Sequence, residues 1–435
     1  MVIEANLESP IVRIGLFATF LLFFVCLTIL VLVEFTLRTL GTAGYTVEPD
    51  ILISTIHYFP AAGRLRIKLA RSYIEQRPAN LGAAEEQMLE ARRWDPYAHE
   101  YPLMLGEIRL VQGNIEGAEN AFSDALSLAP ADHAVHWRLA NLLLAAGKTE
   151  QSLKHFRSVV DLNPALLPLT LDLLWQASNG NVAFLVQVTG DNTESKLKLA
   201  SFFAAKSRPV EAVDIFSSVD TNSVKSLPSA SALLNDLIAK GEVAAAYGLW
   251  LRMKETGPAS HDPTIWNGNF ERPVSLDLKQ FDWQIRESNF AKIYLDSVEG
   301  HSGAGSLEID FLGRDTTVLD HEVSQIFMVR QNTNYQLSFF IKSEGFFSPA
   351  TGPITIVVSS MKGNDPHSTI FRSDPILSGT YGWREMQVDF RSPSANEELI
   401  PLVISLKRQP RFVYDEPTKG RVWLDDFTLS ETVGK

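Results

Sequence analysis

The chain lacks two features that would each indicate a particular class of protein. It has one cysteine, Cys26, among 435 residues, so no intrachain disulfide forms and a disulfide-stapled secreted scaffold is disfavoured. It has no excess of positive charge, since 39 Lys and Arg stand against 51 Asp and Glu, for a formal net charge of −12. An acidic chain has no electrostatic attraction to phosphate, so we expect no nucleic-acid partner.

The common catalytic motifs are also missing from the sequence. It contains no G-x-x-x-x-G-K-[ST], no G-x-G-x-x-G after a strand and no H-E-x-x-H. The segment from Gly300 to Ala304 approaches the nucleophile-elbow pattern but ends in alanine, in a loop that leads to a strand. No two carboxylates stand out as the pair that glycoside hydrolysis needs. We therefore expect that the protein is not an enzyme.

One long apolar run is present near the amino terminus. The twenty residues from Ile14 to Val33 carry no charge, and a helix of that length rises about 30 Å, the thickness of the hydrocarbon core. A signal peptide usually has a shorter apolar stretch, and the run continues into Glu34 and Arg38 without an A-x-A-like cleavage site. A buried core helix fits such an uninterrupted run poorly. The sequence predicts a transmembrane anchor over residues 1–40, followed by a linker over 41–64.

A 34-residue repeat occupies the middle of the chain. Pro96, Pro130 and Pro164 are spaced by 34 residues, and each closes a stretch with the same order of small and aromatic residues. The two clearest copies contain Leu105-Gly106, Gly113, Ala118, Phe122 and Ala125, and then Leu139-Ala140, Gly147, Ser152, Phe156 and Val159. This pattern resembles the tetratricopeptide repeat, which is a helical hairpin.

Each position in the repeat has a physical reason. Gly113 and Gly147 allow the turn between paired helices, and Ala118 is small where the helices cross. Each proline stands where one helix must stop before the next begins. Two weaker copies follow. Residues 167–190 have helical periodicity but lack the small and aromatic residues at the repeat positions, which indicates an eroded repeat. We expect about six helical hairpins in a solenoid over residues 65–260.

A solenoid of this kind presents a groove that holds peptides or partner proteins. By the resemblance, the positions that line the groove are Arg66, Tyr73, Glu100, Glu107, Trp137 and Asn141. The alternative for Trp137 is simple packing between helices. His133 and His136 lie one helical turn apart, but with no third ligand nearby we expect a packed or solvated pair and not a metal site.

The pattern changes to β-structure from about residue 261. Gly257-Pro258 and Asp262-Pro263 end the helical periodicity, and short alternating runs follow, separated by Gly, Pro, Asn or Ser. The runs are at residues 306–311, 335–341, 354–358, 386–390 and 402–406. They predict an antiparallel β-sandwich or jelly roll over residues 261–435.

The ends of this region carry a second resemblance. Residues 267–271 (NGNFE) open it and residues 420–427 (GRVWLDDF) close it, and over 265–432 the order of motifs resembles the galactose-binding-like jelly rolls of bacterial carbohydrate-binding modules. The resemblance implies a structural calcium ion held by Glu271 and Asp426. The alternative is that Asp425 and Asp426 form a polar strand end.

Sugar binding by such modules depends on exposed aromatic rings. Phe346, Phe347 and Tyr381 lie beside glycines in predicted loops and are our candidates for glycan contact. Trp283, Trp383 and Trp423 are also aromatic, but the last two stand in motifs that are usually packing positions. The same sandwich often serves only as a structural module.

Together these elements predict a multidomain α and β chain with a transmembrane helix, a tetratricopeptide-like solenoid and a carboxyl-terminal jelly roll. The architecture resembles accessory proteins of bacterial exopolysaccharide systems. That resemblance implies a non-catalytic adaptor with a protein partner in the groove and a polysaccharide at the sandwich, and it implies no cofactor beyond the calcium. The alternatives are a protein-only scaffold for an inner-membrane complex and a remote glycan-active enzyme.

The membrane orientation is not set by the flanking charges. Arg13 and Arg38 stand at opposite ends of the apolar run, so the positive-inside count is balanced. The kind of domain at the carboxyl end favours a single-pass protein of the bacterial inner membrane, with the bulk of the chain in the periplasm.

Overall fold

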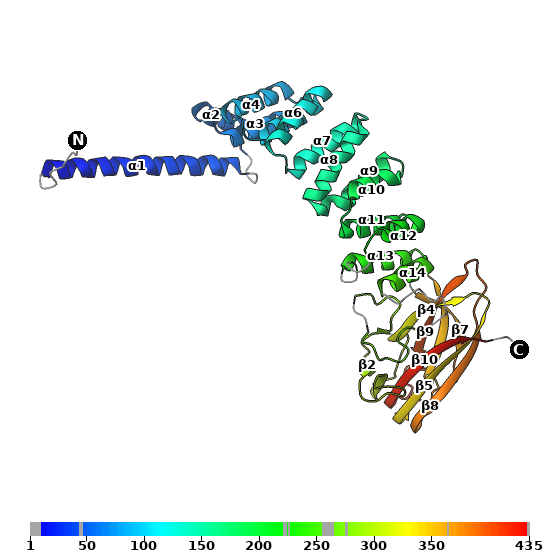
Figure 1. Ribbon diagram of the computed structural model, residues 1–435. Coiled ribbons are helices and arrows are strands. Elements are labelled where there is room, and N and C mark those ends of the chain that lie inside the picture. The colour runs from blue at the N-terminus through cyan, green and yellow to red at the C-terminus, as the bar shows by residue number, and fades with distance from the viewer. Residues whose placement is uncertain are drawn as a thin grey trace, which may run out of the picture. The chain divides into compact units, whose positions relative to one another are not determined.

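The computed structural model describes residues 10–42, 47–220, 224, 227–254, 265–274, 277–362 and 365–432 (Figure 1). The chain divides into two compact units, residues 1–170 and 171–435, which are described separately below. The predicted boundary near residue 260 lies outside the described residues.

The first unit begins with one continuous helix, α1 (Pro10–Gly41), which contains the apolar run. Its apolar side chains face solvent, with Phe17 70% and Leu22 64% exposed. From Arg13 to Gly41 the helix is long and apolar enough to cross a membrane, although a signal sequence meets the same criteria.

Residues 41–64, which we expected to form a linker, contain a helix instead. This is α2 (Pro49–Tyr58), and its Leu52 and Ile56 are buried. They pack with Leu65 and Leu69 of the next helix, and Leu37 from the end of α1 joins the same cluster. The linker expectation is therefore wrong for residues 49–58, where two apolar residues four apart find a partner in the first repeat.

Twelve helices follow α2 in the described residues, in six consecutive pairs. The pairs are α3 (Gly63–Glu75) with α4 (Leu81–Trp94), α5 (Glu100–Val111) with α6 (Ile115–Leu128), α7 (His133–Ala145) with α8 (Thr149–Leu162), α9 (Leu167–Ala177) with α10 (Val182–Thr189), α11 (Thr193–Ala205) with α12 (Pro209–Ser217), and α13 (Pro228–Ala239) with α14 (Val243–Met253). A short 3-10 helix, Pro164–Leu166, precedes α9. The eroded stretch 167–190 contains α9 and α10.

The repeat residues pack as their types require. Ala118 is fully buried in a cluster with Phe122 and Leu139, where a larger side chain has no room. Gly113 and Gly147, between the helices of two pairs, have φ of +79° and +75°, which L-residues other than glycine rarely adopt. Each proline of the 34-residue spacing follows the end of a helix.

Among its described residues, the second unit ends in ten strands in two antiparallel sheets. Sheet A has the order β1 (Gln284–Ile285), β4 (Val323–Arg330), β9 (Leu399–Lys407), β6 (Thr355–Lys362) and β7 (Asp365–Arg372). Sheet B has the order β2 (Ala291–Asp296), β3 (Ser306–Leu312), β10 (Lys419–Glu431), β5 (Asn334–Phe347) and β8 (Gly379–Arg391). From β3 onward, successive strands fall mostly in opposite sheets, in the arrangement of a jelly roll.

The sandwich core consists of side chains from alternate positions of both sheets. On β5, Tyr335, Leu337, Phe339 and Ile341 are buried in it, while the residues between them point outward. All five runs that the sequence marked as strands lie almost entirely within β3, β5, β6, β8 and β9.

The outward face of sheet A is covered. Met328, Val357 and Val403 point away from the core, yet they are only 2%, 0% and 4% exposed. Helix α14 packs on β9, and Trp250 of α14 donates its indole N–H to the Leu278 carbonyl at 2.9 Å. The last helical pair and the sandwich are therefore joined through this face.

Candidate functional site

A hollow in the first unit lies between helices α5, α6 and α7, and we call it the α5–α7 groove. Its volume is about 570 Å³, and it is lined by Glu107, Leu110, Val111, Ile115, Phe122, Trp137, Arg138, Asn141, Leu142, Ala145 and Ala146. Three of its apolar side chains are well exposed: Leu110 at 42%, Val111 at 64% and Ile115 at 43%. Apolar side chains exposed in a hollow are typical of a protein or peptide contact.

Three of the six predicted groove residues meet in this hollow. Trp137 packs edge-on against Phe156, with ring centroids 5.5 Å apart, and remains partly exposed. The Asn141 side-chain amide donates to the Trp137 carbonyl at 2.8 Å, and the Arg138 guanidinium pairs with Glu107 at 2.8 Å. The groove thus offers one aromatic ring and a charged pair above an apolar floor.

The other three predicted residues lie elsewhere. Arg66 is only 7% exposed, and its guanidinium donates to the Pro60 carbonyl and to Gln87, so it is occupied by structural contacts. Tyr73 is partly buried between two core clusters. Glu100 is exposed at the start of α5, outside the residues that line the groove.

We expected His133 and His136 to be a packed or solvated pair and not a metal site. In the structure the ring of His136 has His155 as its partner. His136 of α7 faces His155 of α8, with their Nδ1 atoms 3.0 Å apart, and its Nε2 lies 3.1 Å from the Pro130 carbonyl. Because the Pro130 carbonyl can only accept, Nε2 of His136 carries the hydrogen. In the neutral ring Nδ1 is then the acceptor, and it accepts from the N–H of His155. Burial, and then the neighbouring His136, lowers the pKa of His155.

Among the predicted glycan contacts, Phe346 was expected to be exposed in a loop, and this expectation is wrong. It is 2% exposed and belongs to the sandwich core. The pairing of β5 with β8 shifts register between Ser343 and Phe346, and Gly345 within the shift has φ +56°. This bulge inserts an extra residue and turns Phe346 inward, which simple alternation does not anticipate.

The other two predicted glycan contacts are partly exposed but covered on one side. Lys419 lies over the Phe347 ring with its Nζ 5.6 Å from the centroid. The Arg384 guanidinium lies 4.3 Å from the centroid of the Tyr381 ring, and Tyr381 also packs against the core. Burial raises the pKa of Tyr381 above its ordinary value.

An aromatic cluster on the outward face of sheet B was not predicted. The His301 ring stacks on Phe340 with centroids 3.6 Å apart, and Trp383 meets the edge of the same imidazole at 5.7 Å. Phe340 is partly exposed between two buried neighbours on β5, so strict alternation along the strand could have indicated it. Phe340, His301 and Trp383 are called the sheet B cluster below.

Trp423, by contrast, is held as a packing residue. It is 4% exposed, and its indole N–H is directed at Asp296 (3.2 Å) and Glu308 (3.1 Å). The Lys342 ammonium and the Arg421 guanidinium lie over its ring at 5.2 and 5.1 Å. Beside it, hydrogen bonding to Glu308 raises the pKa of Tyr294 to about 12.

The two carboxylates predicted to hold calcium converge on one loop. Glu271 accepts from the Gly305 N–H at 2.7 Å, while Asp426 accepts from His301 at 2.7 Å and from the Ser302 hydroxyl at 2.5 Å. Asp425 is fully buried and accepts from the His301 N–H, and burial raises its pKa.

This oxygen set fits a hard cation in chemical type. The described residues contain no group of three or more His, Cys, Asp or Glu side chains arranged around a metal, so backbone carbonyls would have to supply further ligands. The calcium ion stays a prediction.

A tetratricopeptide repeat family model matches residues 109–166, which spans α6, α7 and α8 with the end of α5. No curated protein sequence matches the chain. Among solved structures, MamA is similar at 14% identity, covering 35% of this chain and 88% of its own, with a TM-score of 0.29.

Two carbohydrate-binding-module structures are also similar. One is described as "CBM4 structure and function", at 18% identity over 39% of this chain and 99% of its own, with a TM-score of 0.27. The other is the Clostridium thermocellum xylanase 10B with its CBM22-1 and GH10 modules, at 15% identity over 39% of this chain and 29% of its own, with a TM-score of 0.25. Likenesses at such TM-scores carry no argument about function, so the architecture rests on the chain's own structure.

Proposed function

We propose that the protein is a membrane-anchored, non-catalytic adaptor in bacterial surface-polysaccharide synthesis or export. In this proposal α1 holds the chain in the inner membrane and the bulk of it lies in the periplasm. The α5–α7 groove binds a protein partner, and the outward face of sheet B contacts glycan.

The observation that carries the glycan part is the sheet B cluster. Aromatic faces cover the apolar side of a sugar ring without burying its hydroxyls, and flanking polar groups serve those hydroxyls. Phe340 and Trp383 are partly exposed on a face whose other outward residues include Gln336, Ser338 and Gln387. The outward residues of β5 and β8 around the cluster are partly or fully exposed, whereas Met328, Val357 and Val403 on the outward face of sheet A are covered.

Support for the membrane anchor comes from the surroundings of its carboxyl end. Leu37 and Arg38 of α1 line a hollow of about 690 Å³ together with Tyr58, Phe59 and Trp94. Tyr58 is 77% and Trp94 55% exposed. Aromatic rings with an apolar body and a polar tip collect at membrane–water interfaces, where a transmembrane helix emerges.

The glycan part is tested with the full-length chain in detergent. Affinity electrophoresis in gels that contain acidic or neutral polysaccharide should show weak retardation, with Kd in about the millimolar range, and clustering in the membrane would raise the avidity. Trp383→Ala should reduce the retardation, and Phe347→Ala and Tyr381→Ala test the original candidates. Tyr414→Ala is the matched control, because Tyr414 is 82% exposed on the same sandwich and outside the sheet B cluster. Retardation that Trp383→Ala and Tyr414→Ala reduce equally would remove the cluster from the proposal.

A second candidate function, a protein-only scaffold, is favoured by the exposed apolar floor of the α5–α7 groove. Co-purification from solubilised membranes with Trp137→Ala and with Glu150→Ala as an exposed control tests the groove. If no polysaccharide retards the chain, and the partner still co-purifies after deletion of residues 262–435, the scaffold replaces the adaptor. If Trp137→Ala also leaves co-purification unchanged, the groove has no part in either function.

A further inference from the structure

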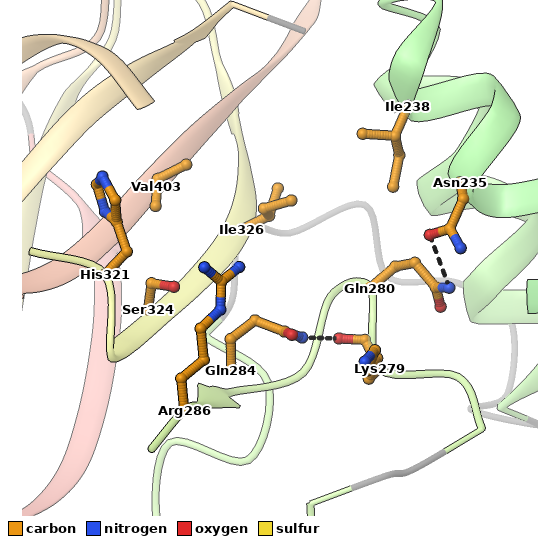
Figure 2. A pocket seen from close by; sticks show the side chains of 10 residues that line it. All are labelled: Asn235, Ile238, Lys279, Gln280, Gln284, Arg286, His321, Ser324, Ile326 and Val403. Atoms are coloured by element: carbon orange, nitrogen blue, oxygen red, sulfur yellow. Dashed lines mark hydrogen bonds between the residues drawn. The ribbon is translucent and has the colours of Figure 1, made fainter. Parts of the chain in front are cut away.

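A small cavity lies where helix α13 meets the sandwich. It has a volume of about 170 Å³ and is lined by Asn235, Ile238, Lys279, Gln280, Gln284, Arg286, His321, Ser324, Ile326 and Val403 (Figure 2). The cavity is separate from the sheet B cluster, because its strand residues belong to β1, β4 and β9 of sheet A. It therefore needs an explanation of its own.

The charge of the cavity is opposite to that of the chain. Lys279 and Arg286 line it and no Asp or Glu does, whereas the whole chain carries −12. Figure 2 shows the Arg286 side chain extending toward Ile326 among the residues that line the cavity. Within the described part of the chain, no hydrogen bond or ion pair engages this guanidinium. An arginine fork with its donors free is suited to two oxygens of a carboxylate.

Polar groups at the two ends of the cavity also lack partners. Gln280 is 6% exposed, and its amide N–H groups are directed at Ser231 Oγ (2.7 Å) and Asn235 Oδ1 (3.1 Å). Its carbonyl oxygen Oε1 is buried and accepts no hydrogen bond in the described structure, and the same holds for Nδ1 of His321. Burial lowers the pKa of His321. Its Nε2 lies 3.1 Å from the Asp320 carboxylate, which can only accept, so Nδ1 of the neutral ring is an acceptor.

One wall of the cavity is apolar. Ile238 and Val403 are each 4% exposed, and Ile326 stands beside them on β4. An apolar cavity of about 150 Å³ accommodates benzene, so this volume accommodates a six-membered ring. An apolar wall with a few convergent polar groups is the usual composition of a small-molecule site.

We propose that this cavity binds a six-membered sugar ring that carries one carboxylate, with the carboxylate on Arg286, hydroxyls on Gln280 and Ser324, and the ring against Ile326 and Val403. This inference goes beyond the proposed glycan contact on sheet B, because it assigns an acidic sugar to a second site on the sandwich. The ligand can come from two sources: a free sugar acid, or an acidic residue within a polysaccharide.

The test is calorimetric titration of the full-length chain in detergent with glucuronate, glucose and inorganic phosphate. We expect glucuronate to bind. Glucose should bind at least about tenfold more weakly, because it lacks the carboxylate that makes a charge-assisted hydrogen bond with Arg286. Arg286→Gln should weaken glucuronate binding about tenfold or more, and Arg286→Lys less, because it keeps the charge without the fork. Arg314→Gln, on an exposed loop of the same sandwich, is the matched control and should bind like the wild type. Equal unfolding midpoints for the variants would show that the losses are local.

Three results would overturn the proposal: no glucuronate binding, equal binding by the wild type and Arg286→Gln, or phosphate binding as tightly as glucuronate. Titration with a polyuronate separates the two sources, since a ligand within a polymer requires that the polymer also binds in an Arg286-dependent way. If the polymer binds and Arg286→Gln has no effect, the cavity inference fails while the glycan contact stands. If glucuronate binds at Arg286 but no polysaccharide retards the chain, the cavity stands and the adaptor role fails.

Discussion

Gly106 of α5 lies so close to the ring of Phe122 of α6 that a Cβ added to it would be 2.4 Å from the ring atom Cε1. Real Cβ contacts are essentially never this short, so any larger residue must displace a fully buried ring. This contact explains why a small residue, Gly106 in this copy and Ala140 in the next, stands at a fixed spacing before a phenylalanine of the repeat. In this copy the ring of Phe122 occupies the space where a side chain of α5 would lie.

Gly106→Ala should therefore destabilise the first unit by about 1–3 kcal/mol through overpacking. The measurement is urea unfolding of the full chain in detergent, followed by far-ultraviolet circular dichroism. Gly82→Ala is the control, because nothing lies within 4 Å of a Cβ at Gly82 in α4, and alanine favours a helix. Equal midpoints for both variants would contradict the packing.

Ala118 tests the same packing from α6. Ala118→Trp should cost about 1–3 kcal/mol or more, since Ala118 is fully buried, whereas Glu116→Ala on the exposed side of the helix should change little. Equal losses at both positions would mean that the faces of α6 are misassigned. The same unfolding measurement gives both values.

The contact between His155 and His136 predicts a dependence of stability on pH. The pKa of His155 is lowered below its ordinary 6.5, chiefly by burial. The unfolded chain therefore binds more protons than the folded chain, and stability falls as the pH drops from above 6.5 through the folded pKa. Hydrogen exchange of the α7 and α8 amides should be faster at pH 5 than at pH 7.5, after correction for intrinsic rates. His155→Gln should remove most of that difference, and His57→Gln, on the exposed side of α2, should leave it intact. A difference that survives His155→Gln would place its origin elsewhere.

The repeats and most strands could be predicted from sequence because each leaves a periodic mark. The spacing of Pro96, Pro130 and Pro164 fixes the helical pairs, and alternation in 335–341 fixes which side of β5 is buried. Helix α2 has no such mark, since it is a single added helix with no second copy. Phe346 was misassigned because we expected it in a loop beside Gly345, whereas β5 extends to Phe347 and the bulge at Gly345 turns Phe346 inward.

The joining of the sandwich to the last helical pair was harder to foresee. In the runs 354–358 and 402–406, Val357 and Val403 lie on the face opposite the other apolar residues, which signals that part of each outward face is buried. The signal does not say which element covers the outward face. That depends on Trp250 and Gln280, whose partners Leu278 and Asn235 lie at sequence separations that no local pattern encodes.

The membrane prediction rests on the exposed apolar side chains of α1. Arg at both Leu22 and Leu27 should release the protein from carbonate-washed membranes, because each central charge costs about 2.5–3.5 kcal/mol on insertion. Arg at Val47 and Ile51, outside α1, is the control and should leave fractionation unchanged. A wild-type protein found in the soluble fraction would refute the anchor.

The calcium prediction concerns the loop that Glu271 and Asp426 both contact. If the two carboxylates hold an ion, calcium binds the folded sandwich and not the unfolded chain, so it raises the unfolding midpoint and chelation lowers it. The buried Asp425 carboxylate, whose pKa is raised by burial, should gain most from a nearby cation.

Differential scanning calorimetry with calcium and with EDTA measures the shift in the unfolding midpoint, and Glu271→Gln should abolish it. Glu287→Gln, which is exposed on the same domain and takes no part in the hydrogen bonds described for this loop, should keep the full shift. An identical midpoint with calcium and with EDTA would contradict the calcium site. The two carboxylates would then form a polar strand end, held by the hydrogen bonds from Gly305, His301 and Ser302 alone.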